Sequence, residues 1–132
     1  MPVTDYFSKK TIYTVHKVSN MEKAKEFYTN ILELNVTFEA PFEFGWCEIA
    51  LPVEGAYLGL SLNREETLTS VDVLNLSCTN LEGMLKVLKD KGVEVSEITD
   101  IPDMISSFSI KDPDGNTISF IGAPRKKSSR EI

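Results

Sequence analysis

The sequence has one histidine, one tryptophan and two cysteines among its 132 residues. Two cysteines are too few for a disulfide framework, and the start, Met-Pro-Val-Thr-Asp, lacks the basic and apolar regions of a secretion signal. No apolar run approaches the roughly 20 residues that a membrane-spanning helix needs. These shortages together predict a cytoplasmic protein with no membrane partner.

Positive charge is also scarce, because 14 Lys and Arg stand against 20 Asp and Glu and leave a formal net charge of −6. This balance argues against nucleic acid as a partner. The basic run Arg125-Lys126-Lys127 lies in a polar C-terminal tail, residues 123–132, which we expect to be mobile. The length fits one structural domain, or two small modules that share a core.

What the sequence does contain is an internal repeat. In the turn Asp112-Pro113-Asp114-Gly115, the Asp112 side chain can accept hydrogen bonds from the nearby backbone and Gly115 tolerates a positive φ. A similar turn, Pro52-Val53-Glu54-Gly55, stands sixty positions earlier, and a strand pattern follows each turn. The repeat occurs twice, so it predicts a two-fold duplication and not a solenoid.

Each half of the repeat has the pattern strand, helix, strand, strand, strand. Asn20 and Asn80, again sixty positions apart, precede amphipathic runs and are expected to cap the two helices. The first helix should end near Glu33, and Gly92 should end the second. We expect a first module at 11–62, a linker at 63–70 and a second module at 71–122, with strands at 11–18, 36–39, 46–51, 56–62, 71–78, 93–98, 104–110 and 116–121.

The two-residue period of a strand sorts the side chains of each module onto two faces. The face rich in Leu, Ile, Phe and Cys should pack on the helix, whereas the other face is more polar and keeps three large aromatic residues. A concave, partly apolar wall with a few polar groups is what a small-molecule pocket requires. We therefore expect an α+β fold in which two βαβββ modules form a curled mixed sheet around a cavity, with ligand-binding residues Tyr13, Lys17, Trp46, Glu48, Tyr57, Asn75 and Ser119.

Two stretches of the chain carry a resemblance to a known family. They are Val18-Ser-Asn-Met-Glu-Lys-Ala-Lys-Glu-Phe-Tyr-Thr-Asn-Ile-Leu32 and Asp112-Pro-Asp-Gly-Asn-Thr-Ile-Ser-Phe120. In combination they resemble the vicinal oxygen chelate superfamily, which includes glyoxalase I, extradiol dioxygenases, fosfomycin-resistance thiol transferases and bleomycin-resistance proteins. The resemblance covers about residues 11–122 and implies paired βαβββ modules whose sheets curl around one cavity, usually in a homodimer.

The resemblance also implies where a metal would bind. Metal-dependent members use a His near the start of each first strand and a Glu in each fourth strand. The matching places in this chain hold Tyr13, Gly59, Val73 and Ser119, none of which is a His or a carboxylate. We therefore expect no metal ligands and no cofactor, which leaves the metal-free, drug-binding members compatible with the sequence.

The single histidine and the two cysteines are interpreted as structural. Alternation places His16 on the helix-facing side with Ile12 and Val18, although a slip of one residue would move it to the cavity. Cys47 and Cys78 fall on the same side as His16 and are expected to be buried apolar thiols.

Glu48 is the candidate for catalysis, because it lies between Trp46 and Ala50 on the cavity side. It could act in acid–base chemistry, or it could bind a cationic or hydroxylated ligand. Lys17 could counter Glu48 or bind an anionic group. The first hypothesis is a protein that binds or sequesters a small organic molecule. The alternatives are a glyoxalase-type lyase, isomerase or dioxygenase, either metal-dependent through ligands not identified or metal-independent with Glu48, and a dimeric structural or regulatory module.

Overall fold

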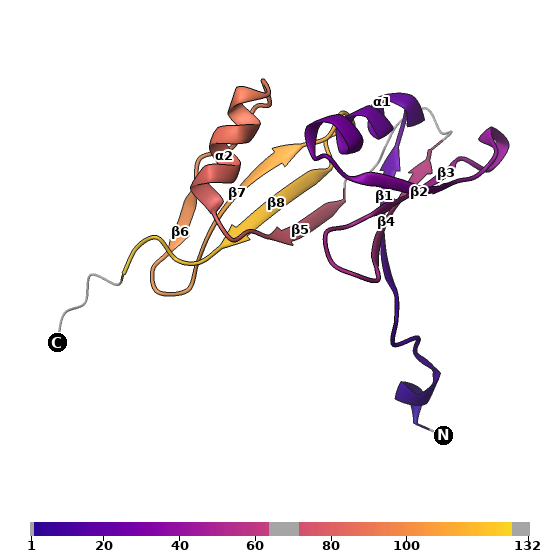
Figure 1. Cartoon of the computed structure of the whole chain (residues 1–132), viewed down its shortest axis with the longest axis horizontal. Helices are drawn as coiled ribbons and strands as arrows, with labels where there is room; N and C mark the ends of the chain where they lie inside the picture. Colours follow the sequence, from indigo (N-terminus) through magenta and orange to yellow (C-terminus); the bar gives the residue numbers. More distant parts are fainter. Residues whose placement is uncertain (1, 64–71, 128–132) are drawn as a thin grey trace. The chain divides into compact units, whose positions relative to one another are not determined.

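The computed structural model describes residues 2–63 and 72–127. The chain divides into two compact units, residues 1–69 and 70–132 (Figure 1). Apart from residue 63, the expected linker lies outside the described residues, as do residues 128–132 of the expected tail. Among these described residues, each unit has one four-stranded mixed sheet and one α-helix, so the prediction of an α+β fold with two βαβββ modules is confirmed.

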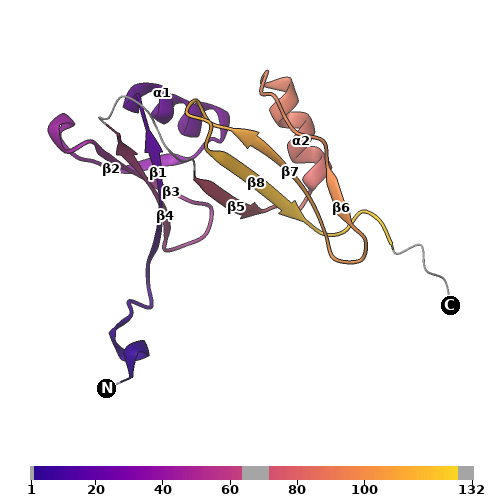
Figure 2. The same cartoon turned by 180° about the vertical axis from the view of Figure 1, so that it is seen from behind.

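The first unit, whose strands are labelled in Figure 2, has the sheet order β1-β4-β3-β2. β1 is parallel to β4, whereas β3 is antiparallel to both β4 and β2. A parallel neighbour requires a long crossover, and the helix with the two following strands supplies it. The elements are η1 (Val3–Tyr6), β1 (Ile12–Val18), α1 (Met21–Glu26), η2 (Phe27–Ile31), β2 (Asn35–Glu39), η3 (Phe42–Phe44), β3 (Trp46–Ala50) and β4 (Ala56–Leu62).

The second unit repeats this topology with the order β5-β8-β7-β6. β5 is parallel to β8, and the remaining pairs are antiparallel. The elements are β5 (Val73–Ser77), α2 (Leu81–Asp90), β6 (Thr99–Ile101), β7 (Ile105–Lys111) and β8 (Thr117–Gly122). The duplication seen in the sequence is therefore a duplication of strand order as well.

The helix starts and the Asp112 turn form as their sequences predict. Asn20 Oδ1 accepts a hydrogen bond from the Lys23 backbone N–H at 3.0 Å, and Asn80 Oδ1 accepts one from the Gly83 N–H at 3.0 Å. Asp112 Oδ1 accepts from the backbone N–H groups of Asp114 and Asn116, each at 2.9 Å. These side chains satisfy backbone donors that the helix start and the turn would otherwise leave open.

The first helix differs from its prediction. Its α-helical part ends at Glu26, and residues Phe27–Ile31 form a π-helical turn in which the Leu32 N–H donates to the Phe27 carbonyl at 3.3 Å. The Thr29 hydroxyl donates to the Lys25 carbonyl at 2.8 Å, and such side-chain bonds compete with the regular helical pattern. The helix therefore widens where its apolar spacing is still regular.

The prediction of a strand at residues 93–98 is wrong. The edge strand β6 instead covers Thr99–Ile101, a segment that the sequence assigned to a loop. Ser96 explains the difference, because its hydroxyl accepts the Ser109 backbone N–H at 2.8 Å while its own N–H donates to the Ser109 carbonyl at 2.9 Å. A side chain thus takes one of the backbone bonds that a regular strand pair would make.

The core of each unit lies between its sheet and its helix. In the first unit, alternate residues of β1, β3 and β4 are buried against α1 and η2, and in the second unit alternate residues of β5, β7 and β8 are buried against α2. The apolar members of the two cores are Val18, Ala24, Tyr28, Cys47, Ile49, Leu58 and Leu60, and Leu74, Leu81, Leu88, Phe108, Ile110, Ile118 and Phe120. No helix in the described ranges is long and apolar enough to cross a membrane.

Candidate functional site

The side of the first sheet that faces away from α1, which we call the open face, brings five of the predicted site residues together. Strand register arranges this face in rows, because residues paired across neighbouring strands point the same way. Tyr13 pairs with Tyr57, and Lys17 pairs with Ser61, which in turn pairs with Trp46. The central row runs from Val15 through Gly59 to Glu48 and ends at Phe38.

Tyr13 and Tyr57 form a stacked pair at one end of the open face. Their ring centroids are 5.2 Å apart and the ring planes are inclined by 24°. Tyr13 is 51% exposed, so one side of the pair remains in contact with solvent. An exposed aromatic surface of this kind suits a planar, partly apolar ligand.

Trp46 lies over the centre of the open face, above Gly59. A Cβ atom added to Gly59 would overlap the indole ring, with the ring atom Cζ2 only 2.6 Å away. Gly59 is consequently buried although it belongs to the face turned away from the helix. Only a residue without a side chain allows the indole to lie this close to the sheet.

Glu48 fixes the orientation of the indole. Its Oε2 accepts a hydrogen bond from Trp46 Nε1–H at 2.9 Å. Both side chains are half-buried. The indole is thus held by Gly59 underneath and by a carboxylate at its edge, which makes it a pre-oriented aromatic surface. Lys17 is exposed and lies in the row of Trp46, one row away from Glu48.

Sequence reasoning missed Phe38, which is 53% exposed and lies in register with Glu48. A β-bulge between Val36 and Phe38 shifts the pairing of β2 with β3. Because a bulge adds a residue, it reverses the alternation from that point onward. Simple alternation could not detect this reversal, although the aromatic residue in an edge strand was a visible signal.

The remaining two predicted site residues, Asn75 and Ser119, belong to the second unit. They are paired across β5 and β8, and Ser119 also pairs with Ser109 of β7. Asn75 is exposed and Ser119 is half-buried. They therefore share one face of the second sheet, and their part in ligand binding stays a prediction.

His16 and Cys47 lie on the helix side of the first sheet, as alternation predicts. Both are fully buried, and His16 Nδ1 lies 2.9 Å from the Tyr28 hydroxyl, at hydrogen-bond distance. Burial raises the pKa of Cys47 to about 11. Cys78 is half-buried and not fully buried as predicted, and this partial burial still raises its pKa. Neither thiol has the lowered pKa of a nucleophilic cysteine.

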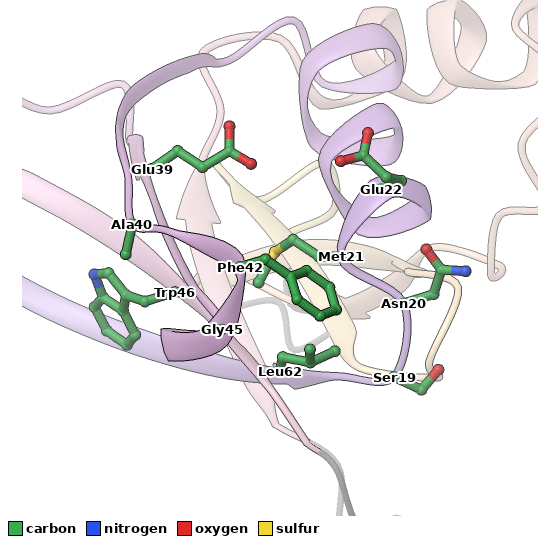
Figure 3. Close-up of a pocket in the computed structure, with 10 residues that line it drawn as sticks. All are labelled: Ser19, Asn20, Met21, Glu22, Glu39, Ala40, Phe42, Gly45, Trp46 and Leu62. Carbon is green, nitrogen blue, oxygen red and sulfur yellow. The ribbon is translucent and has the colours of Figure 1, made fainter.

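A separate pocket of about 420 Å³ opens in the first unit, at the end of the sheet where β1 and β4 finish (Figure 3). Met21 and Phe42 both line it, and in this view Glu22 and Glu39 lie on opposite sides of its upper part. Lys25 Nζ links these two carboxylates, at 3.3 Å from Glu22 and 2.8 Å from Glu39. The full lining is Ser19, Asn20, Met21, Glu22, Glu39, Ala40, Phe42, Gly45, Trp46 and Leu62.

Of the predicted site residues, only Trp46 borders this pocket, and in Figure 3 its indole points away from Phe42 and Met21. The pocket was missed because the short η3 turn and the helix start build it, and neither has a periodic pattern. The available signal was the pair Phe42 and Phe44 in a segment bounded by Pro41 and Gly45.

The positions where the resemblance implies metal ligands hold residues whose chemistry does not suit a divalent ion. Gly59 and Val73 have no donor atom, the space above Gly59 is filled by Trp46, and a serine hydroxyl such as Ser119 is a poor ligand. In the described part of the chain, no group of three or more His, Cys, Asp or Glu side chains could hold a metal ion.

Comparison with known proteins gives one family and many similar folds. The model of the Glyoxalase/Bleomycin resistance protein/Dioxygenase superfamily matches residues 13–120. TnmS3, an antibiotic binding protein from Streptomyces sp. CB03234, superimposes with a TM-score of 0.76 at 23% identity and covers 89% of this chain and 98% of its own. No curated protein sequence matches this chain.

Two further solved structures resemble the chain to a similar degree. An integron cassette protein from the mobile metagenome of the Halifax Harbour sewage outfall has a TM-score of 0.74 at 23% identity, and covers 87% of this chain and 99% of its own. Lactoylglutathione lyase from Agrobacterium tumefaciens has a TM-score of 0.73 at 13% identity, and covers 87% and 94%. At these identities the likeness establishes the fold alone.

Proposed function

Because the chain belongs to the Glyoxalase/Bleomycin resistance protein/Dioxygenase superfamily, we propose that it binds a small organic molecule on the open face of its first sheet without a metal ion. The observation that carries this proposal is the packing of Trp46 on Gly59. Metal-dependent members are expected to have a carboxylate ligand at the position of Gly59. In this chain Gly59 instead lies beneath the indole ring of Trp46. The same space therefore favours stacking over metal coordination.

The open face offers a ligand three kinds of contact. The indole of Trp46 and the Tyr13–Tyr57 pair supply flat apolar surfaces for a planar ring. Glu48 accepts the indole N–H through one oxygen, and its carboxylate has further acceptor capacity for an N–H or O–H group of the ligand. Lys17 places a cation at the outer row, where it would attract an anionic substituent.

The ligand class that fits these contacts is a planar aromatic molecule with polar substituents. An antibiotic is a reasonable first choice of probe, because TnmS3, one of the structural neighbours, is an antibiotic binding protein. This likeness sets the choice of probe and does not identify the ligand.

Calorimetric titration of the purified protein with planar aromatic antibiotics tests the proposal, after a mass-spectrometric search for molecules that co-purify. We expect one ligand per chain, and we expect Trp46→Ala to weaken binding by more than about 1 kcal/mol through the loss of stacking. Val53→Ser is the matched control, because Val53 is 66% exposed in the turn between β3 and β4, outside the binding surface. Equal affinity of the wild type and Trp46→Ala for every bound molecule would remove the open face as the site.

A further inference from the structure

The cavity drawn in Figure 3, which we call the pocket beside α1, takes no part in the proposed function. It shares only Trp46 with the predicted site residues of the open face, and its volume of about 420 Å³ lies in the range of small-molecule sites. Its walls come from the start of α1, the end of β2, the η3 turn with the start of β3, and the end of β4. The pocket is therefore a second candidate site in the first unit.

Backbone hydrogen bonds hold the walls of this pocket in place. The Ala40 N–H donates to the Trp46 carbonyl at 2.9 Å. The Gly45 N–H donates to the Phe42 carbonyl at 3.0 Å, and the Gly45 carbonyl accepts the Leu62 N–H at 2.8 Å. Because these bonds tie the η3 turn to β3 and β4, the pocket exists before a ligand arrives, and little conformational freedom is lost on binding.

The interior of the pocket is mainly apolar. Met21, Phe42 and Leu62 line it, and in the view of Figure 3 Leu62 lies below the Phe42 ring. Phe42 is 75% exposed, so a ligand in the pocket would remove part of this ring from water. Removal of apolar surface from water favours binding. A ligand for this pocket should therefore have a small apolar body, such as a single ring.

The charged side chains among the described lining residues are both acidic. In the view of Figure 3, Glu22 and Glu39 lie above the Phe42 ring. Lys25 contacts both carboxylates, at 3.3 Å from Glu22 and 2.8 Å from Glu39, so two negative charges and one positive charge leave this group at −1. Glu22 uses one oxygen for Lys25, and its carboxylate keeps acceptor capacity for another N–H donor. The remaining charge favours a cationic ligand over an anionic one.

We propose that the pocket beside α1 is a second binding site of this chain, which takes a small organic monocation with one apolar ring and a protonated amine. The ring packs against Met21, Phe42 and Leu62. The ammonium group lies at the carboxylates of Glu22 and Glu39, where an anion of the same shape is rejected by the same charge. This site goes beyond the proposed function and does not depend on ligand binding at the open face.

NMR titration of the isotopically labelled full-length chain tests the site with three probes: phenethylammonium, 2-phenylethanol and phenylacetate. The probes share a phenyl ring and differ in charge. We expect phenethylammonium to shift the backbone amide signals of Met21, Gly45 and Leu62 saturably, with a dissociation constant about fivefold or more below that of phenylacetate and with 2-phenylethanol in between. This preference should decrease as salt is added, because Glu22 is exposed.

Three outcomes of this titration would overturn the proposal. The first is equal affinity for phenethylammonium and phenylacetate. The second is the lack of a saturable shift at millimolar phenethylammonium. The third is a set of saturable shifts confined to Tyr13, Val15 and Gly59, which would place the probe on the open face instead.

Two variants separate the apolar and the charged contribution, and both change exposed side chains. Phe42→Ser should weaken the binding of phenethylammonium about fivefold. Glu22→Gln should bring the affinities for the cation and the anion within about twofold of each other, because the carboxylates and Lys25 then carry no net charge. Glu54→Gln is the matched control, since Glu54 is exposed in the β3–β4 turn, and it should leave both affinities unchanged. Thermal midpoints check that each variant is folded. A cation preference that persists in Glu22→Gln, or unchanged affinity in Phe42→Ser, would overturn the site as well.

Discussion

At the scale of single residues, Trp46 and Gly59 depend on each other, since the indole occupies the space that any larger residue at position 59 would need. The sequence showed an aromatic residue and a glycine on the same face of neighbouring strands. It could not show that one covers the other, because rotamers and diagonal contacts do not follow from alternation. The residue types were predictable, and their arrangement was not.

Substitution Gly59→Ala tests this dependence. The new methyl group should displace the indole from the sheet and lengthen its hydrogen bond to Glu48. We expect a change in the wavelength of tryptophan emission and a loss of about 1–3 kcal/mol in the free energy of unfolding, as for other overpacked sites. Gly92→Ala is the control, because no atom lies within 4 Å of an added Cβ there, although its φ of 84° carries a backbone penalty. Unchanged emission from the Gly59→Ala protein would contradict the packing.

The thiols provide a second test at this scale. Because burial raises the pKa of Cys47 to about 11, that thiol should react with a thiol reagent at about pH 8 only after unfolding in guanidinium chloride. A raised pKa favours the protonated thiol in the fold. Its stabilising contribution is therefore complete below the ordinary pKa near 9 and is lost as the pH rises from there through about 11. Rapid labelling of Cys47 in the native protein, followed by mass spectrometry, would contradict its burial.

At the scale of elements, the order and type of the strands and helices followed from the sequence, but some boundaries did not. The repeat, the capping asparagines and the Asp112 turn each combine a pattern with a local hydrogen bond, so they could be predicted. The predictions for the strand around Ser96 and for the helix around Thr29 failed for a shared reason. In both places a hydroxyl group bonds to the backbone and changes the regular element, and the apolar pattern does not report such bonds.

Removing either helix cap should have a measurable cost. Asn20→Ala and Asn80→Ala each leave a backbone N–H at the helix start without its side-chain acceptor, so each should lower the free energy of unfolding by about 1 kcal/mol. Asp is the matched replacement, since its carboxylate also accepts this bond, and Asn80→Asp should retain most of the stability. Denaturation midpoints measured for all variants decide the matter. An Ala variant as stable as the wild type would mean that the cap does not stabilise that helix.

The contact between Arg125 and Asp100 of β6 predicts that the stability of the fold depends on pH. Arg125 donates two hydrogen bonds to Asp100, at 3.0 and 2.7 Å, and the Ser106 hydroxyl donates another at 2.6 Å. The Arg125 guanidinium, with Ser106, lowers the pKa of Asp100 below its usual range. The stabilisation is therefore present above the ordinary pKa of an aspartate and is lost as the pH falls below it.

Thermal midpoints recorded from neutral to acidic pH should show a smaller acid-induced decrease for Asp100→Asn than for the wild type. Asp90→Asn is the control, because Asp90 pairs with exposed Lys86 on the surface of α2. Identical pH profiles for the wild type and Asp100→Asn would contradict the role of this contact. Arg125 and Lys126, which the sequence assigned to a mobile tail, are thus in contact with Asp100.

At the scale of the whole molecule, the duplication determines the fold, and features that occur in only one half make the two units different. Both halves keep the parallel pairing of the first and fourth strands. The bulge at Phe38, the η3 turn and the exposed η1 turn belong to the first half. Sequence reasoning therefore identified the open face from the repeat, but it missed the pocket beside α1, which non-repeated segments build.

The most direct test of the account is a tryptophan fluorescence titration of the protein after dialysis against a chelator. Trp46 is the only tryptophan in the sequence, so the emission reports the surroundings of this one side chain on the open face. Without metal, a planar aromatic ligand should quench the emission saturably, with the same dissociation constant before and after dialysis. A response that disappears on dialysis and returns with a divalent ion would contradict metal-independent binding on the open face.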